Sequence, residues 1–296
     1  MNMEITLSGG HQTEIYIETY GSGSPILFLH GGPGCCHDSF APFFKPLMER
    51  CQVIYYDQIA CGQSSQSVDW EYHLSHELEV IEQIRQNLGH ERLTIVGESW
   101  GTFLGLQYAS HYPHRVLDLV LLSSVGFGME HMHLFSDRLM AKVTDADRQQ
   151  LAYIEQQLQN HEVEETEALR SSQEILNPYY LFDRSRLSEI INQPINFQQH
   201  LRVVALFDEE LDFMKRVENL KQVRIHMYQA TNDLISNQDI ATILVDKINP
   251  TSFIAVPECG HWIYLEKSEY INSEIMNIIS TNLVPIEERS LTENIA

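Results

Sequence analysis

Basic side chains are scarce in this chain of 296 residues. Lysine and arginine together number 19 against 41 aspartates and glutamates, which leaves a formal net charge of -22. Such a charge repels nucleic acids and anionic membranes, because both carry negative phosphates. We therefore expect no nucleic-acid partner and no membrane partner, and we interpret the acidic excess as a solvated surface.

Long apolar runs and an orderly set of cysteines are also missing. No stretch approaches the roughly 18 apolar residues of a membrane span, and the polar residues 1–10 lack the basic and apolar regions of a signal peptide. The five cysteines are odd in number and irregularly spaced, which is a poor basis for a disulfide framework. We expect a cytoplasmic protein with reduced thiols. Cys61 and Cys259 fall near the predicted site, so a reactive thiol stays open as the alternative to an inert one.

Strand and helix patterns alternate along most of the chain. Apolar runs bounded by turn residues predict strands at residues 14–20, 25–30, 52–57, 92–97, 116–123, 223–228 and 252–256. Apolar residues spaced three and four apart predict helices over residues 74–88, 240–248 and 270–279. This alternation predicts an α/β fold with a mostly parallel central sheet and helices on both faces.

The alternation stops between residues 126 and 221. This segment is polar and helical in pattern, with a long amphipathic stretch at residues 139–159 and no clear strand. We predict that residues 126–221 form a helical cap domain inserted into a core domain made of residues 1–125 and 222–296. We call residues 126–221 the cap segment.

Residues 97–101, which read GESWG, follow a predicted strand and precede a helical pattern. This is the strand, turn and helix arrangement of a G-x-S-x-G nucleophile elbow. In such a turn the serine backbone is strained, and side chains two residues on either side would collide with neighbouring main chain, which explains Gly97 and Gly101. Ser99 is therefore the candidate nucleophile.

A serine hydroxyl needs a base, and the base needs a carboxylate that orients it. Of the 14 histidines, His261 lies just past the last predicted strand, at the edge where ligands gather in open α/β sheets. Asp233 follows the penultimate strand at the same edge, which gives the chain order Ser, Asp, His. Asp239, on the following helix, is the fallback.

The oxyanion of an acyl-transfer reaction needs two backbone N–H donors. We predict one from Trp100, directly after the nucleophile, and one from Gly32, in the loop 30–34 that reads HGGPG. His30 is better explained as a residue that holds this loop than as a second base.

Signals for a metal or a nucleotide cofactor are weak. His131 and His133 flank one methionine after Glu130, but histidines two apart on a helix point to different sides, and no further ligands accompany them. No glycine-rich phosphate loop follows a strand. We therefore expect no metal and no cofactor.

These motifs together resemble the proline iminopeptidase family of α/β-hydrolases. The similarity rests on HGGPG at residues 30–34, on Asp57-Gln58 with Gly62 and Ser64, and on GESWG, in order over nearly the whole chain. The resemblance implies the α/β-hydrolase fold with a helical cap inserted after the sixth core strand. It also implies no metal, a triad of Ser99, Asp233 and His261, oxyanion donors at Gly32 and Trp100, and release of N-terminal residues from small peptides.

Three departures from the family pattern bear on the substrate. The family's usual D-Q-R-G-x-G-x-S reads DQIACGQS at residues 57–64, and Glu98 replaces the usual glycine before the nucleophile. The cap motif that would bring a glutamate to the substrate's amine is not cleanly present, and Glu209 and Glu210 form the nearest acidic cluster. We take Glu98, Glu209 and Glu210 as candidate substrate-binding residues, with a solvated helix face as the alternative for the last two.

Three functions stay open at this stage. The first is a serine aminopeptidase acting on small peptides or amino-acid amides through an acyl-enzyme. The second is an esterase, lactonase or general amidase that acts on small acyl substrates. The third is a ligand-binding protein that keeps the hydrolase fold without depending on turnover. All three require a small-molecule or short-peptide ligand.

Overall fold

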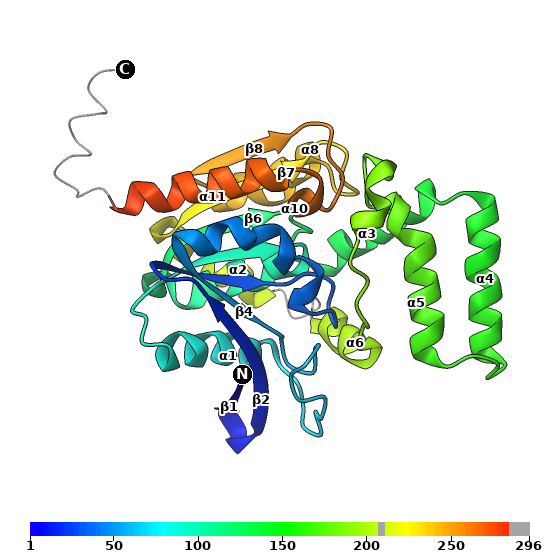
Figure 1. The fold of residues 1–296 in the computed structure, drawn as a ribbon, viewed down its shortest axis with the longest axis horizontal. Helices are drawn as coiled ribbons and strands as arrows, with labels where there is room; N and C mark the ends of the chain where they lie inside the picture. Colours follow the sequence, from blue (N-terminus) through cyan, green and yellow to red (C-terminus); the bar gives the residue numbers. More distant parts are fainter. Residues whose placement is uncertain (207–210, 284–296) are drawn as a thin grey trace.

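The computed structural model describes residues 1–206 and 211–283, and its centre is an eight-stranded sheet (Figure 1). The strands are β1 (Asn2–Thr6), β2 (Gln12–Tyr20), β3 (Ser24–Leu29), β4 (Cys51–Tyr56), β5 (Leu93–Glu98), β6 (Val116–Leu122), β7 (Arg224–Ala230) and β8 (Ser252–Val256). Their order across the sheet is β1-β2-β4-β3-β5-β6-β7-β8. The pairs β1·β2 and β2·β4 are antiparallel and the others are parallel, so the predicted mostly parallel sheet is confirmed.

Helices connect the strands and cover both faces of the sheet. They are α1 (Leu74–Asn87), α2 (Trp100–His111), α3 (Met129–Lys142), α4 (Asp145–Gln159), α5 (Glu165–Leu176), α6 (Phe197–Ala205), α7 (Leu211–Arg216), α8 (Asn237–Ile240), α9 (Asp246–Ile248), α10 (Ile263–Glu266) and α11 (Ser268–Leu283). A π-helical turn, Ala241–Val245, joins α8 to α9. The three predicted helices therefore exist, the second of them as this short composite.

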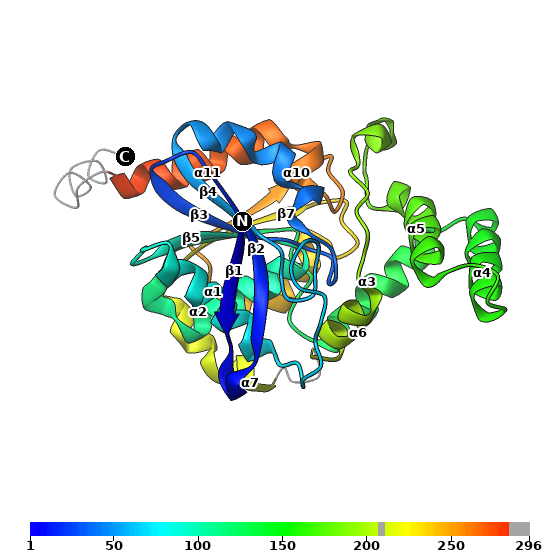
Figure 2. The same ribbon diagram turned by 60° about the horizontal axis from the view of Figure 1, so that its bottom comes forward.

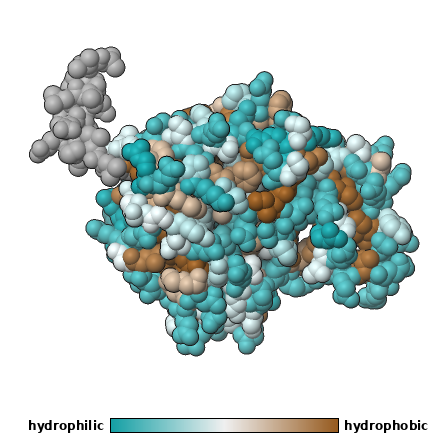
Figure 3. All heavy atoms as spheres, viewed as in Figure 1, coloured by the Kyte–Doolittle hydropathy of each residue, from teal (hydrophilic) through white to brown (hydrophobic). Residues whose placement is uncertain are grey.

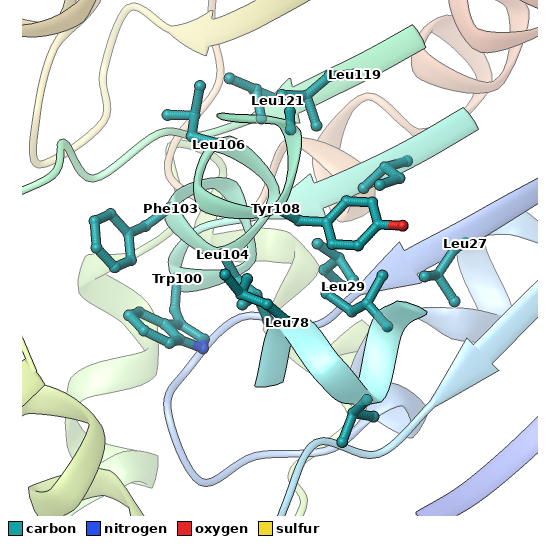
Figure 4. Packing of buried hydrophobic residues seen from close by; sticks show 14 of the residues in the cluster. Leu27, Leu29, Leu78, Trp100, Phe103, Leu104, Leu106, Tyr108, Leu119 and Leu121 are labelled. Atoms are coloured by element: carbon teal, nitrogen blue, oxygen red, sulfur yellow. The ribbon is translucent and has the colours of Figure 1, made fainter. Parts of the chain in front are cut away.

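Alternate residues of each buried strand enter different hydrophobic cores, because successive strand side chains point to opposite faces. Leu27 and Leu29 of β3 pack with α1 and α2, whereas Ile26 and Phe28 pack with the chain around α10 and α11. Figure 4 shows the first of these cores, in which side chains of α2 lie against strand residues such as Leu119. This two-sided burial is why the strands read as nearly continuous apolar runs.

The N-terminal strand β1 was not predicted. Only Ile5 of its five residues is buried, and the strand pairs with β2 in antiparallel register at the sheet edge. A short, mostly polar edge strand has almost no apolar pattern to detect. With β1 counted, β6 is the sixth strand, and the segment that follows it is the cap segment.

The described residues of the cap segment form helices joined by loops, without a strand. Figures 1 and 2 both show α3, α4, α5 and α6 standing to one side of the sheet. The amphipathic stretch 139–159, taken as one unit in the sequence, is two helices. The Thr144 side chain caps α4 by accepting a hydrogen bond from the Asp147 backbone N–H, which ends the continuity after Lys142.

Helix α7 packs differently from the rest of the cap segment. It lies against α2 of the core, where Phe213 contacts Phe103 with ring centroids 6.5 Å apart. The surface in Figure 3 is mostly hydrophilic, with hydrophobic residues visible over the α4 and α5 pair and in patches over the core. Among the described helices, each is too short or too polar to span a lipid bilayer.

Candidate active site

Ser99 occupies a strained turn between β5 and α2. Its φ and ψ are 52° and -118°, a conformation that non-glycine residues rarely adopt. A Cβ on Gly97 would lie 2.3 Å from the Gly101 carbonyl oxygen, and one on Gly101 would lie 2.1 Å from the Leu29 carbonyl oxygen. Both glycines are therefore required by the close approach of the main chain, as predicted from the sequence.

The three predicted triad side chains lie in one row. The Ser99 Oγ is 2.9 Å from His261 Nε2, and His261 Nδ1 is 2.8 Å from Asp233 Oδ1. Because Asp233 accepts the Nδ1 proton, the neutral imidazole presents Nε2 as an acceptor to the serine hydroxyl. This is the arrangement in which a histidine can take a proton from a serine.

Asp233 is itself held by two donors. Its Oδ1 accepts the backbone N–H of Leu234 at 2.6 Å, and its Oδ2 accepts Gln229 Nε2 at 2.9 Å. Gln229 also donates to the Ile235 carbonyl oxygen and accepts the Ser124 backbone N–H at 2.7 Å. Sequence reasoning missed Gln229, because a glutamine near the end of a strand carries no pattern of its own.

The fallback carboxylate, Asp239, has another role. It forms an ion pair with Arg138 of α3 and accepts a hydrogen bond from the Ser236 hydroxyl. The hydrogen bond from Arg138 holds the Asp239 pKa near 2, well below its usual value. Asp239 therefore ties the cap segment to the core and is not the partner of His261.

The base is buried, and its electrostatic environment is acidic. Burial lowers the pKa of His261, but the charge and hydrogen bond of Asp233 and the nearby Glu98 carboxylate outweigh burial, so the pKa is raised overall. The backbone of His261 is fixed by its own N–H, which donates to the Tyr180 carbonyl oxygen at 2.7 Å. A residue of the cap segment thus helps to position the base.

The two predicted oxyanion donors line the same cavity as Ser99. Trp100 is the first residue of α2, and the N–H groups at a helix start have no acceptor within the helix. Gly32 has a φ of +48°, which favours glycine, and it lies in the loop after β3. The predicted pair and the Ser99 hydroxyl therefore border one cavity.

Gln58 connects the two halves of this region. Its Nε2 donates to the His30 carbonyl oxygen at 2.9 Å, and its Oε1 accepts the indole N–H of Trp100 at 2.9 Å. His30 is completely buried, accepts the Gln58 backbone N–H at Nε2, and has its pKa lowered to about 4 by burial. A neutral His30 and Gln58 therefore hold the loop 30–34 against the start of α2.

The cavity in front of Ser99 has a volume of about 550 Å³. The core contributes the catalytic residues to its wall, and the cap segment contributes apolar side chains from α3, α5 and the chain before α6, among them Met132, Leu139, Leu176 and Ile191. The cap segment therefore forms part of the cavity wall at the carboxyl ends of the parallel strands.

Glu98, a candidate substrate-binding residue, lies in this cavity wall. Burial raises its pKa to about 7, with smaller effects from His261, Asp233 and the Gly31 backbone. The other two candidates, Glu209 and Glu210, lie outside the described residues.

The structure places the remaining candidates from the sequence, His131, Cys61 and Cys259, in buried surroundings. His131 Nδ1 accepts the Gly128 backbone N–H at 3.1 Å at the start of α3, so it caps that helix. Over residues 1–206 and 211–283, no three His, Cys, Asp or Glu side chains are grouped to hold a metal ion. Cys61 and Cys259 are buried, and burial raises the pKa of both thiols.

Comparisons with known proteins agree with this fold. Residues 24–268 match the family described as the alpha/beta hydrolase fold. A proline iminopeptidase of Saccharolobus solfataricus is 32% identical over 136 residues, which is 43% of this chain and 44% of that relative, so less than half of the relative's length is matched. A proline iminopeptidase of Thermoplasma volcanium is 23% identical over 273 residues, or 87% of this chain and 89% of the relative.

Solved structures add evidence on the fold alone. A thermophilic esterase from Thermogutta terrifontis superposes with a TM-score of 0.66 at 17% identity, over 95% of this chain and 98% of the esterase. At this level of identity the likeness extends to the architecture and leaves the substrate open.

Proposed function

The chain belongs to the alpha/beta hydrolase fold family, is similar to its proline iminopeptidases, and from this premise we propose that it is a serine hydrolase with Ser99 as nucleophile. The observation that carries the proposal is the row of hydrogen bonds from Ser99 to His261 to Asp233. The strained backbone of Ser99 supports it further, because such strain is kept where a hydroxyl must be presented to a ligand.

The reaction proceeds by two acyl transfers. The Ser99 Oγ attacks the substrate carbonyl carbon while His261 Nε2 takes the hydroxyl proton, and Asp233 stabilises the imidazolium. The N–H groups of Gly32 and Trp100 donate to the oxyanion. Collapse of the tetrahedral intermediate breaks the bond between the carbonyl carbon and the leaving amine or alcohol. The leaving group receives the proton from His261. Water, deprotonated by His261, then attacks the acyl-enzyme and releases the acid.

The substrate class we propose is a small peptide or amino-acid amide that is cleaved at its N-terminal residue. The curated relatives that are named proline iminopeptidases support this assignment. The cavity supports it as well, because a volume of about 550 Å³ under a cap accommodates one or two residues and excludes a folded protein.

A second candidate is an esterase, lactonase or general amidase. The apolar side chains that the cap segment places over Ser99 favour it, since they suit a plain acyl group as well as an amino-acid side chain. This candidate uses the same triad and differs only in what the cavity recognises.

A panel of chromogenic substrates tests these proposals. We expect p-nitroanilides of proline, alanine or leucine to be hydrolysed when the amine is free and to resist hydrolysis when it is acetylated. Equal rates on free and acetylated anilides, or activity on p-nitrophenyl esters alone, would support the second candidate. Ser99→Ala is the matched control and should abolish every activity, and a wild-type protein inactive on the whole panel would favour a ligand-binding role.

A further inference from the structure

Glu98 precedes the nucleophile, and its side chain is only 6% exposed. Among the described residues, its Oε1 is buried without a hydrogen-bond partner. A Cβ added to Gly31 would lie only 2.0 Å from Glu98 Oε2, so the carboxyl group lies directly against the loop that carries Gly32. A buried carboxyl oxygen with no partner is costly for folding, which suggests that a ligand completes it.

Among the described residues of the cavity wall, none is a permanent cation, and the charge of the catalytic base His261 only partly offsets the effect of burial on the Glu98 pKa. Of the described residues that line it, Glu98 is the one carboxylate, and none is a lysine or an arginine. The rest of the wall consists mainly of apolar and uncharged polar side chains. An acidic group isolated in such surroundings attracts a positively charged ligand strongly, because little water or counter-charge screens it.

Aromatic rings line the same part of the cavity. Tyr180 stacks on Trp262 with ring centroids 5.0 Å apart, and Tyr264 also lines the wall. Burial raises the pKa of both tyrosines, and the charge of the Glu98 carboxylate, which lines the same cavity, raises it further. Aromatic faces beside a carboxylate are a favourable setting for an ammonium group.

We propose that Glu98 is the residue that recognises the substrate, by binding a protonated amine next to the scissile carbonyl. The inference rests on the proposed function and extends it to a specific residue. Glu98 adjoins Ser99 in sequence and contacts the loop of the oxyanion donor Gly32, so a cation held by its carboxylate lies within a few atoms of the attacked carbon. An α-amino group fits that distance. The substrates are therefore amino-acyl compounds with a free amine, and their side chain lies among the apolar residues from the cap segment.

Calorimetric titration tests the proposal without turnover. The probes are leucinamide, which carries the amine, and 4-methylpentanamide, which is the same molecule without it, and the protein is the full-length Ser99→Ala variant. We expect leucinamide to bind about tenfold or more tightly than the neutral amide, as loss of one charge-assisted hydrogen bond predicts. Adding Glu98→Gln should remove the difference by weakening leucinamide alone.

Two further variants make the result interpretable. Glu77→Gln, added to Ser99→Ala, is the matched control, because Glu77 is also buried with a pKa of about 7 but lies outside the cavity wall. It should keep the preference for leucinamide. Glu98→Gly, which installs the residue usual in the family at this position, serves if the glutamine variant does not fold, and it should lose the preference.

Equal binding of the two amides by Ser99→Ala would overturn the proposal, and so would a preference that survives both substitutions of Glu98. The wild-type assay on p-nitroanilides and p-nitrophenyl esters separates this outcome from failure of the proposed function. A protein that hydrolyses esters while binding both amides equally is a serine hydrolase without an amine site. A protein that prefers leucinamide but hydrolyses nothing has the amine site without the activity.

Discussion

His200 of α6 donates a hydrogen bond from its Nδ1 to the Pro33 carbonyl oxygen, 3.0 Å away. The acceptor is a carbonyl, so the proton must be on Nδ1. One turn earlier, Asn196 donates its backbone N–H to the Gly34 carbonyl oxygen at 2.9 Å and its side-chain amide to the Ala60 carbonyl oxygen at 2.9 Å. The start of α6 therefore holds the loop 30–34, and with it the proposed oxyanion donor Gly32.

His200→Phe tests whether this contact positions the oxyanion loop. Phenylalanine keeps an aromatic ring beside Phe197 but has no donor for Pro33. We expect kcat on a small ester to fall by up to about tenfold, the equivalent of one hydrogen bond, with KM nearly unchanged. His200→Asn, whose amide nitrogen can replace Nδ1, should restore most of the rate. Wild-type kcat in His200→Phe would show that the contact is structural only.

Asp233→Asn tests the orientation of the base. The asparagine amide can turn its NH₂ towards His261 Nδ1, which favours the imidazole tautomer that cannot accept the serine proton. We expect kcat to fall by roughly 10³ to 10⁴ with little change in KM. Asp239→Asn is the matched control, since Asp239 follows the same strand but pairs with Arg138. It should retain activity within a factor of a few, and similar losses in both variants would contradict the assignment.

The pH profile of kcat/KM reports the protonation of His261. The raised pKa of His261 places the acidic limb above the ordinary histidine value of 6.5, and activity rises with pH as the imidazole loses its proton. Glu98→Gln removes one of the charges that raise this pKa, so the limb should move to lower pH. An uncharged ester keeps the substrate's own titration out of the profile. Glu77→Gln should leave the limb unchanged, and an upward movement in Glu98→Gln would be inconsistent with the electrostatics of the site.

Thiol reagents should act slowly on the native protein. Thiolates are the reactive species, and burial raises the pKa of Cys61 and Cys259. With Ellman's reagent we expect all five cysteines to react in denaturant, and neither Cys61 nor Cys259 to react rapidly in the folded protein. Peptide mapping after a short exposure identifies the modified residue. Prompt modification of either one would mean that the loops open readily.

The sequence was sufficient for the residues whose roles depend on strand ends. Ser99, Asp233 and His261 each follow a strand of a parallel sheet, and the carboxyl ends of such strands converge, so their meeting could be predicted. Gly97 and Gly101 could be predicted equally well, because the close approach of the main chain in a nucleophile elbow requires glycine at both positions.

Residues that act across the interface of core and cap could not be predicted. The contact of His200 with Pro33 depends on where the cap segment sits, and helical periodicity gives only which face of α6 is apolar. Gln58 accepts the indole N–H of Trp100, which is 42 residues away along the chain, and a pair so far apart leaves no spacing in the sequence. Gln229 is only four residues from Asp233, but a glutamine near the end of a strand carries no pattern of its own. The break between α3 and α4 was missed for a smaller reason, namely that one capping threonine interrupts an otherwise continuous amphipathic pattern.

The central claim is that Ser99 is an activated nucleophile, and covalent labelling measures this directly. A fluorophosphonate should attach to the wild-type protein once, and peptide mass spectrometry should locate it on Ser99. Labelling should be absent in Ser99→Ala and strongly slowed in His261→Ala, with both variants showing wild-type melting curves. A folded wild-type protein that does not react, or one labelled at another residue, would contradict the claim.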